Sequence, residues 1–222
     1  MQPLAQLLDS LEAFYGEQSP AWPADPYLFL IWWHCGYPAS DAACAKGWTS
    51  LTGRFSLEPD SLLAANPSRL AAALKHGGTF PELRALRLKE IAERVLKEFG
   101  GDLIGSLRRL PLAKARSALK NFPGIADPGA DRILLFAGLS PIPAVPSNCP
   151  HVLVRIQFGG KPENYGVMYS EARRVIANGV PATPDARIRA YLLLRRHGQE
   201  TCRRTNPKCA ACPAVKSCAF AA

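Results

Sequence analysis

The sequence predicts an all-α protein with two helical lobes. Apolar residues recur at helical spacing along most of the chain, and no convincing alternation of apolar and polar residues predicts a strand. Proline or glycine marks most of the segment boundaries, as expected of short helices. A proline-rich stretch, GLSPIPAVPSNCP (Gly138–Pro150), separates two groups of helices. These three observations favour two packed groups joined by one crossing segment.

The N-terminal part predicts a surface helix followed by a buried helix. The first, Pro3–Tyr15, carries apolar residues at helical spacing rather than the apolar block of a secretory signal. These residues are Leu4, Leu7, Leu8, Leu11 and Phe14. The second, Pro26–Cys35, contains YLFLIWW, which is apolar all round and far too short to span a bilayer. We therefore expect a soluble, cytoplasmic protein.

The next helices lead up to the clearest one in the chain, Pro81–Phe99. Its apolar residues fall on one face, and Lys89, Glu93 and Lys97 fall at four-residue intervals on the other. The shorter helices before it are predicted at Ser40–Leu51, Leu57–Ala64 and Pro67–Ala73. Those after it are predicted at Leu112–Asn121, Pro128–Ala137, Pro150–Phe158, Tyr169–Ala177 and Asp185–His197.

Composition narrows the class of protein. The 222 residues allow one large domain or two small ones, and a hydrophobic content of 48% supports a packed core rather than disorder. The net charge of +9 indicates either a merely basic surface or a polyanionic partner, most often nucleic acid. An odd number of cysteines, seven, argues against a disulfide framework inside the cell.

Four of the cysteines crowd into the C-terminal segment TCRRTNPKCAACPAVKSCAF. Their spacing is Cys202-x6-Cys209-x2-Cys212-x5-Cys218, which lets four thiolates converge on one centre. Two disulfides, a structural zinc ion and an iron–sulfur cluster are the alternatives. A zinc ribbon usually brings two C-x2-C pairs and only one is present, so the spacing favours the cluster.

With its preceding residues, HGQETCRRTNPKCAACPAVKSCAF resembles the C-terminal 4Fe-4S loop of the endonuclease III family of DNA glycosylases. The resemblance implies that the four cysteines hold a 4Fe-4S cluster. It also implies that cations between the ligands hold DNA phosphates, although they could equally be a solvated surface. These cations are Arg203, Arg204, Lys208 and Lys216.

The middle of the chain extends this resemblance. SALKNFPGIADPGADRILLFAG is similar to the family's helix-hairpin-helix, with the typical pattern L-P-G-V-G-x-K-T-A, followed later by V-D-T-H or V-D-S-N. In that family a tight turn presents main-chain groups to a DNA phosphate, and the target base is turned out into a pocket. The resemblance implies that Phe122, Gly124, Ile125 and Ala126 form a turn that binds DNA without reading its sequence.

Both positions that carry the family's chemistry differ in this chain. FPGI (Phe122–Ile125) matches L-P-G-V and places Pro128 where bifunctional members carry a lysine nucleophile. VPSN (Val145–Asn148) matches V-D-S-N and places Pro146 at the aspartate. Residues 132–162 contain no acidic residue, so another alignment of the second motif recovers no carboxylate.

Two aspartates of the hairpin remain as weak catalytic candidates. Asp127 also suits the N-cap of the next helix, with Pro128 at the first helical position. Asp131 is expected in the first turn of that helix, where a negative charge suits the helix dipole.

The family's glutamine that inserts into DNA is missing as well. WWHCGYPASD (Trp32–Asp41) stands where the family typically has L-S-A-Q-x-T-D. Tyr37 lies near the glutamine position and could stack on a base, or it could be an ordinary half-buried tyrosine. His34 is interpreted as a core or capping histidine. Cys149 and His151 are a candidate nucleophile pair near the expected pocket.

The resemblance covers about Pro26 to Phe220 and implies a division into domains. Residues 26–139 would form a six-helix barrel with the hairpin at about 112–137. Residues 1–25 and 140–222 would form a second helical lobe that ends in the cluster loop 202–218.

Two classes of function follow from the sequence. In the first, the chain is a DNA-binding protein of base-excision-repair type, which holds damaged or distorted duplex DNA through the hairpin and the basic cluster loop and lacks the β-lyase step. The alternative is an active monofunctional DNA N-glycosylase that uses non-standard catalytic residues. Both imply double-stranded DNA as partner, no membrane, and a monomer.

Overall fold

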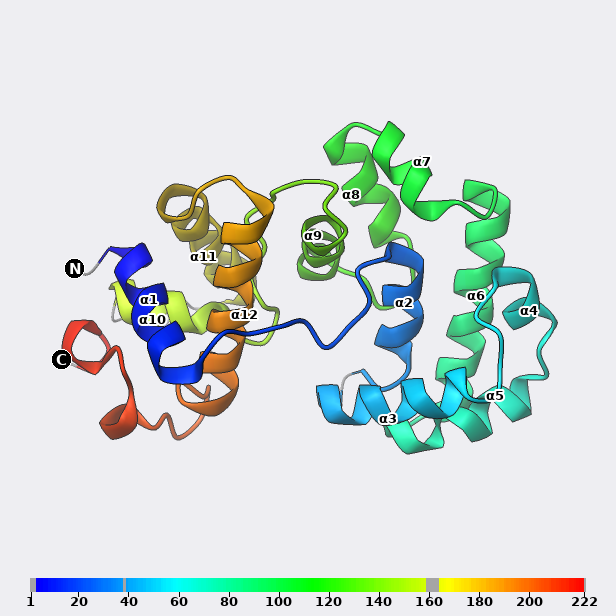
Figure 1. The fold of residues 1–222 in the computed structure, drawn as a ribbon, viewed down its shortest axis with the longest axis horizontal. Coiled ribbons are helices and arrows are strands. Elements are labelled where there is room, and N and C mark those ends of the chain that lie inside the picture. Colours follow the sequence, from blue (N-terminus) through cyan, green and yellow to red (C-terminus); the bar gives the residue numbers. More distant parts are fainter. Residues whose placement is uncertain (1–2, 38, 159–163, 222) are drawn as a thin grey trace. The chain divides into compact units, whose positions relative to one another are not determined.

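The computed structural model describes residues 3–37, 39–158 and 164–221, which form helices and connecting loops without a strand (Figure 1). The predicted all-α class is confirmed. The chain divides into two compact units: a middle unit, Ala21–Ile125, and a terminal unit, Met1–Pro20 with Ala126–Ala222. The boundary falls within the predicted hairpin turn. The six-helix barrel over residues 26–139 stays a prediction.

The middle unit packs around α6, its longest helix. Its elements are α2 (Pro26–His34), α3 (Asp41–Thr52), α4 (Pro59–Ala64), α5 (Pro67–Leu74), η1 (Lys75–Gly77), α6 (Pro81–Phe99), α7 (Leu103–Arg109) and α8 (Leu112–Lys120). Helices α2, α4 and α5 pack against α6, and α2 also contacts α3 and α7. Phe29, Leu30 and Ile31 of α2 are buried, as are Leu88 and Ile91 of α6, so the predicted burial of α2 is confirmed.

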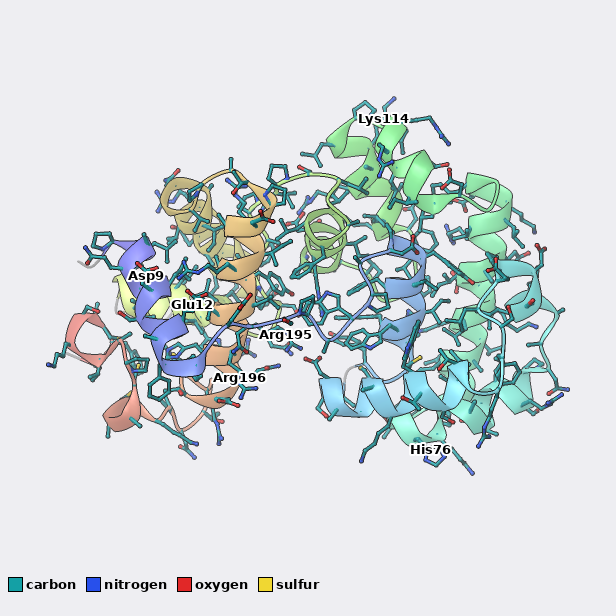
Figure 2. All side chains as sticks on the ribbon, viewed as in Figure 1. Asp9, Glu12, His76, Lys114, Arg195 and Arg196 are labelled. Atoms are coloured by element: carbon teal, nitrogen blue, oxygen red, sulfur yellow. The ribbon has the colours of Figure 1, made fainter. Side chains whose placement is uncertain are left out.

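The terminal unit joins the two ends of the chain. Its elements are α1 (Leu4–Tyr15), α9 (Asp127–Phe136), α10 (Pro150–Phe158), α11 (Tyr165–Gly179), α12 (Pro184–Glu200), η2 (Cys209–Ala211) and η3 (Val215–Ser217). The buried leucines of α1 pack with α11 and α12. Arg189 on α12 pairs with Asp9 at 2.8 Å and Glu12 at 2.7 Å, the two acidic residues labelled on α1 (Figure 2).

Side-chain caps followed by proline explain several helix starts. Asp25, Asn66 and Thr183 each accept a hydrogen bond from an amide of the first helical turn, and Pro26, Pro67 and Pro184 follow them directly. Proline suits this place because the first amides of a helix have no partner within it.

The structure adds one helix to the predicted set and begins another earlier than predicted. Helix α7 was not predicted, because Gly105 interrupts a short segment, yet Asp102 caps it by accepting from the amide of Gly105 at 2.8 Å. Helix α11 begins at Tyr165, before the predicted Tyr169, because the Asn164 side chain caps the amide of Val167. The other predicted helices agree to within a few residues. Among the described residues, no helix combines the length and apolar character needed to cross a membrane.

Candidate nucleic-acid interface and cysteine loop

The turn between α8 and α9 is a tight reversal of the main chain at Gly124. Gly124 adopts a φ of 71°, in the left-handed region that favours glycine, and the amide of Ile125 donates to the carbonyl of Phe122 at 3.2 Å. Gly124 and Ala126 are exposed, whereas the side chains of Phe122 and Ile125 are buried. Only main-chain groups of those two residues could therefore reach a phosphate. The DNA-binding role of all four residues stays a prediction.

His34 holds this turn from within the middle unit. Its Nε2 lies 2.8 Å from the carbonyl oxygen of Pro123, and a Cβ on Gly124 would lie 3.4 Å from the imidazole Cε1. Burial lowers the pKa of His34 to about 4, so the ring is neutral and Nε2–H donates to Pro123. Its Nδ1 has no hydrogen-bond partner in the described part of the chain. The predicted core role of His34 is confirmed.

Pro128 and Pro146, which the predicted resemblance aligns with the family's catalytic positions, are both buried. Pro128 lies in the first turn of α9, where its missing N–H is not needed. Pro146 lies in the loop before α10, and its carbonyl accepts from the amide of Cys149 at 2.9 Å. Lys114 and Lys120 on α8 are exposed, and Lys114 projects outward (Figure 2).

Asp127 is the first residue of α9 rather than its N-cap. The cap residue is Ala126, whose backbone is extended at φ −110° and ψ −174°, so the helix begins one residue earlier than predicted. Ala126 offers no side-chain cap to the first amides of α9. Asp127 is half-buried and adds a negative charge to the first turn.

Asp131 lies beyond the first turn of α9, where it was predicted, and its buried carboxylate forms an ion pair. Its carboxylate is 0% exposed, accepts a hydrogen bond from the Tyr169 hydroxyl at 2.7 Å, and lies 3.3 Å from Nε of Arg173. Burial, followed by the nearby Asp131 charge, raises the pKa of Tyr169. Asp131 therefore fixes α11 to α9 and presents no surface to a substrate.

Tyr37 stacks on Trp33. The ring centroids are 3.9 Å apart and the planes 19° from parallel, so one face of the tyrosine is covered. The side chain is half-buried, and a base could stack only on its other face. Base stacking by Tyr37 stays a prediction.

Phe80 is a candidate functional residue that the sequence analysis missed. It is 71% exposed and has φ 54° and ψ 49°, a left-handed conformation that costs a non-glycine residue about 1–2 kcal/mol. The signal was the segment GGTFP, in which two glycines and a proline surround an aromatic residue. A single aromatic side chain held outward by strained backbone is a suitable group to insert between bases.

Arg84 fixes the loop that carries Phe80. The buried guanidinium donates to five main-chain carbonyls: those of His34, Cys35, Leu74, Gly78 and Thr79. It thereby joins the loop before α6 to the end of α2, which also carries the histidine that holds the hairpin turn. Arg84 precedes Leu88 by four residues and Ile91 by seven, a helical spacing that could have marked it as buried.

The four C-terminal cysteines line one small pocket in the terminal unit. Cys202, Cys209, Cys212 and Cys218 share it with apolar side chains that include Ile156, Val215 and Phe220. Burial raises the pKa of Cys202 and Cys212, so their thiolate forms need a compensating positive charge. A bound metal centre would supply that charge.

The four thiols are the candidate donor set for a metal centre. In the described residues, no three His, Cys, Asp or Glu side chains stand close enough to hold one metal ion together. All four cysteines nevertheless line one pocket. Four cysteine thiolates are the usual ligand set of a 4Fe-4S cluster, so the residue types agree with that group. The cluster itself stays a prediction.

Buried basic side chains of α10 hold the cysteine loop. Arg155 donates to the carbonyls of Arg203 at 2.6 Å and Arg204 at 2.8 Å. His151 Nε2 lies 2.7 Å from the carbonyl oxygen of Cys202. Since His151 serves this loop and Cys149 is a buried thiol whose pKa burial raises to about 12, the two do not form a nucleophile pair.

The basic residues of the loop point to its surface. Arg203, Arg204, Lys208 and Lys216 are all exposed. Their contact with DNA stays a prediction. Cys35 and Cys44, outside the loop, are buried.

Two known proteins are similar in sequence to most of this chain. No protein-family model matches the chain. The chain is 25% identical over 212 residues to a thymine-DNA glycosylase of Aeropyrum pernix, covering 93% of this chain and 88% of the relative. It is 27% identical over 168 residues to a thymine/uracil-DNA glycosylase of Pyrobaculum aerophilum, covering 73% of this chain and 66% of the relative.

Solved structures share the fold. An endonuclease III trapped as a covalent intermediate with DNA matches with a TM-score of 0.76 and 18% identity, covering 100% of this chain and 98% of that one. A thermostable thymine-DNA glycosylase matches with a TM-score of 0.76 and 22% identity, covering 98% and 95%. The chain therefore has the helical fold of endonuclease III.

Proposed function

We propose, from its place in the helix-hairpin-helix DNA glycosylase superfamily, that this chain is a DNA-binding protein of base-excision-repair type. It holds damaged or distorted duplex DNA through the hairpin turn and the basic cysteine loop, and it has no β-lyase step. The observation that carries the proposal is an intact hairpin turn followed by Pro128, a buried proline at the position of the lysine nucleophile.

The holding function is supported by the construction of the turn. His34 fixes the Pro123 carbonyl, Gly124 permits the sharp reversal, and Ala126, the N-cap residue of α9, has no polar side chain to cap the helix. Main-chain amides at a turn and a helix start bind phosphate without reading base sequence. Exposed cations of the cysteine loop would add phosphate contacts whose strength falls with salt.

A preference for distorted DNA is supported by Phe80. Its exposed ring would enter the stack where bases are already unpaired or missing, because opening an intact stack costs a few kcal/mol. Arg84 fixes the loop, so the ring is presented without further ordering.

Loss of β-lyase chemistry is supported by what the two prolines cannot do. A Schiff base needs an amine within reach of the sugar carbon, and Pro128 provides none. The aspartate that would stabilise positive charge on the sugar is replaced by Pro146. Asp131 is fully engaged by Tyr169 and Arg173.

A monofunctional glycosylase is the second candidate, because the two curated relatives carry glycosylase names and one alignment covers 93% of this chain. Asp127, half-buried at the hairpin, is the carboxylate placed to serve it. Base release from a panel of lesion-bearing duplexes, abolished by Asp127→Asn, would establish this alternative in place of pure binding.

The proposal includes a 4Fe-4S cluster held by Cys202, Cys209, Cys212 and Cys218. When bound, the cluster supplies positive charge that compensates the thiolates and a centre capable of one-electron transfer. Arg155 and His151 hold the main chain of the loop around it.

The deciding experiment compares binding with covalent trapping. Fluorescence anisotropy should show tighter binding to duplexes with an abasic site or a mismatch than to matched duplex, and Phe80→Ala should reduce that preference. Leu86→Ala, at an exposed apolar residue of α6, is the matched control. Borohydride should trap no covalent complex with abasic DNA. Efficient trapping at a lysine, or equal affinity for all duplexes, would contradict the proposal.

A further inference from the structure

We propose that His197, oriented by Tyr15, donates a hydrogen bond to the sulfur of Cys212 and raises the reduction potential of the iron–sulfur cluster. The inference rests on the cluster of the proposed function. It links that cluster, through His197, to Tyr15 near the N-terminal end of the chain. It concerns the redox property of the cysteine loop, separately from DNA binding.

The geometry is a continuous line of polar groups inside the terminal unit. The hydroxyl of Tyr15, the last residue of α1, lies 2.6 Å from Oγ1 of Thr201 and 2.9 Å from Nδ1 of His197. The opposite nitrogen of that imidazole, Nε2, lies 3.8 Å from Sγ of Cys212. His197 is 0% exposed, so water does not compete for either ring nitrogen.

The direction of each hydrogen bond follows from the sulfur. A cysteine bound to iron has no proton and can only accept, so Nε2 of His197 carries the hydrogen. Its Nδ1 must then accept, and the donor is the hydroxyl of Tyr15. The Tyr15 oxygen in turn accepts from the hydroxyl of Thr201. Every group in the line is satisfied in this one arrangement and in no other with a neutral imidazole.

This arrangement explains why a tyrosine of α1 reaches the cysteine loop. A ligand's outer partner fixes its orientation and tunes the metal centre, as the second nitrogen of a metal-bound histidine commonly shows. Here the ligand is a thiolate, and the tuning group is the imidazole. A donor at the sulfur stabilises the more negative, reduced cluster, and low local polarity strengthens the effect.

A second side chain, Arg155, also lies near a cysteine sulfur of the loop. Nη1 of Arg155 lies 3.8 Å from Sγ of Cys202. Arg155 also donates hydrogen bonds to the carbonyls of Arg203 and Arg204, so substituting Arg155 would disturb the fold of the loop. Tyr15 and His197 are therefore the cleaner probes of the potential.

The test uses full-length protein purified without oxygen, with iron and sulfide content, visible absorbance and a redox titration followed by electron paramagnetic resonance. Tyr15→Phe removes the hydroxyl that fixes the imidazole, and His197→Gln changes the donor itself. We expect both to lower the midpoint potential, by up to about tenfold in the equilibrium constant for reduction, or about 59 mV for one electron. Tyr27→Phe is the control, because it deletes a hydroxyl bonded to Leu57 in the other unit.

Each outcome decides the inference. A lower potential in Tyr15→Phe with unchanged iron content, and no change in Tyr27→Phe, supports it. If His197→Gln fails to fold or to hold iron, Tyr15→Phe alone decides. An unchanged potential in Tyr15→Phe overturns the relay while leaving the cluster and DNA binding intact. Absence of iron and sulfide from the wild-type protein overturns the cluster, and the relay with it, without bearing on the hairpin turn.

Discussion

The hairpin turn and the cysteine loop are held by the same kind of device, each within its own unit. In the middle unit, buried Arg84 donates to main-chain carbonyls of the loop before α6, and His34 donates to the carbonyl of Pro123. In the terminal unit, buried Arg155 and His151 bind carbonyls of the cysteine loop. His34 thus shapes the hairpin turn and Arg84 shapes the loop that carries Phe80, whereas Arg155 and His151 together shape the cysteine loop.

The two segments differ in what else they need. The groups that shape the turn find their partners in the protein itself, so the turn is complete as folded. The cysteine loop gathers four thiols in one pocket, and burial opposes their ionisation. Its stability should therefore depend on a metal centre that the turn does not need. Five predictions test this difference.

Metal removal should give the largest effect and confine it to one unit. Oxidation and chelation of the metal centre should lower the stability of the terminal unit by more than about 5 kcal/mol, because metal binding is coupled to folding of the loop. All four tryptophans lie between residues 22 and 48, so their fluorescence reports the middle unit alone. In urea, far-UV circular dichroism should show an early transition while the tryptophan midpoint stays unchanged. A joint shift of both signals would contradict independent shaping of the segments.

Arg84→Met should destabilise the middle unit by about 3–5 kcal/mol, because several buried carbonyls lose their donor. The urea concentration at the midpoint of the tryptophan fluorescence transition measures this loss of stability. Arg84→Lys should recover part of the loss, since an ammonium can reach fewer carbonyls. Arg108→Met, at an exposed arginine of the same unit, is the control and should change little. An equal effect of both methionine variants would show that the carbonyls are held by other groups.

The sequence predicted far more of the fold than of these holding devices. Helical periodicity, with proline and glycine at the boundaries, located most helices, because burial of an apolar face repeats along the chain. It missed α7, where a single cap at Asp102 decides. The cysteine spacing predicted the loop, and the family pattern predicted the turn. Main-chain carbonyls leave no trace in a sequence, so the carbonyl contacts of Arg84 and Arg155 could not be predicted from it.

Side-chain roles at the hairpin show the same limit. The sequence placed Asp131 at the helix dipole, but Tyr169 and Arg173 from α11 engage it. That contact joins residues about forty positions apart and follows from tertiary packing alone. Phe80 was overlooked because exposure and left-handed backbone are properties of the folded chain.

Acid should weaken the middle unit through His34. Its pKa falls from 6.5 in the unfolded chain to about 4 in the folded one, so the folded state binds fewer protons. Stability is complete above about pH 6.5 and is lost as the pH falls towards 4, by up to about 3 kcal/mol. Tryptophan-monitored urea titrations across this range measure the loss. His34→Gln should flatten the dependence, whereas His76→Gln, at an exposed histidine, should not.

Gly124→Ala tests whether the turn itself is the DNA contact. The left-handed backbone and the nearby imidazole should cost about 1–2 kcal/mol of stability. Gly100→Ala carries a similar backbone cost at φ 60° in the same unit, with open space around it. Only Gly124→Ala should also weaken binding to abasic duplex in fluorescence anisotropy. Equal affinities for the two variants would place the phosphate contact elsewhere.

The smallest effect should come from the rim cations, the exposed basic residues Arg203, Arg204, Lys208 and Lys216 of the cysteine loop. Lys208→Ala and Lys216→Ala should each reduce the slope of log affinity against log salt by about 0.9, the value for one phosphate contact on duplex DNA. The loss should be uniform across duplex sequences, because phosphate contacts carry no sequence information. Lys97→Ala, at an exposed lysine of the middle unit paired with Glu93, is the control. If the slope is unchanged in both loop variants, the rim cations are a solvated surface, and the turn alone holds DNA.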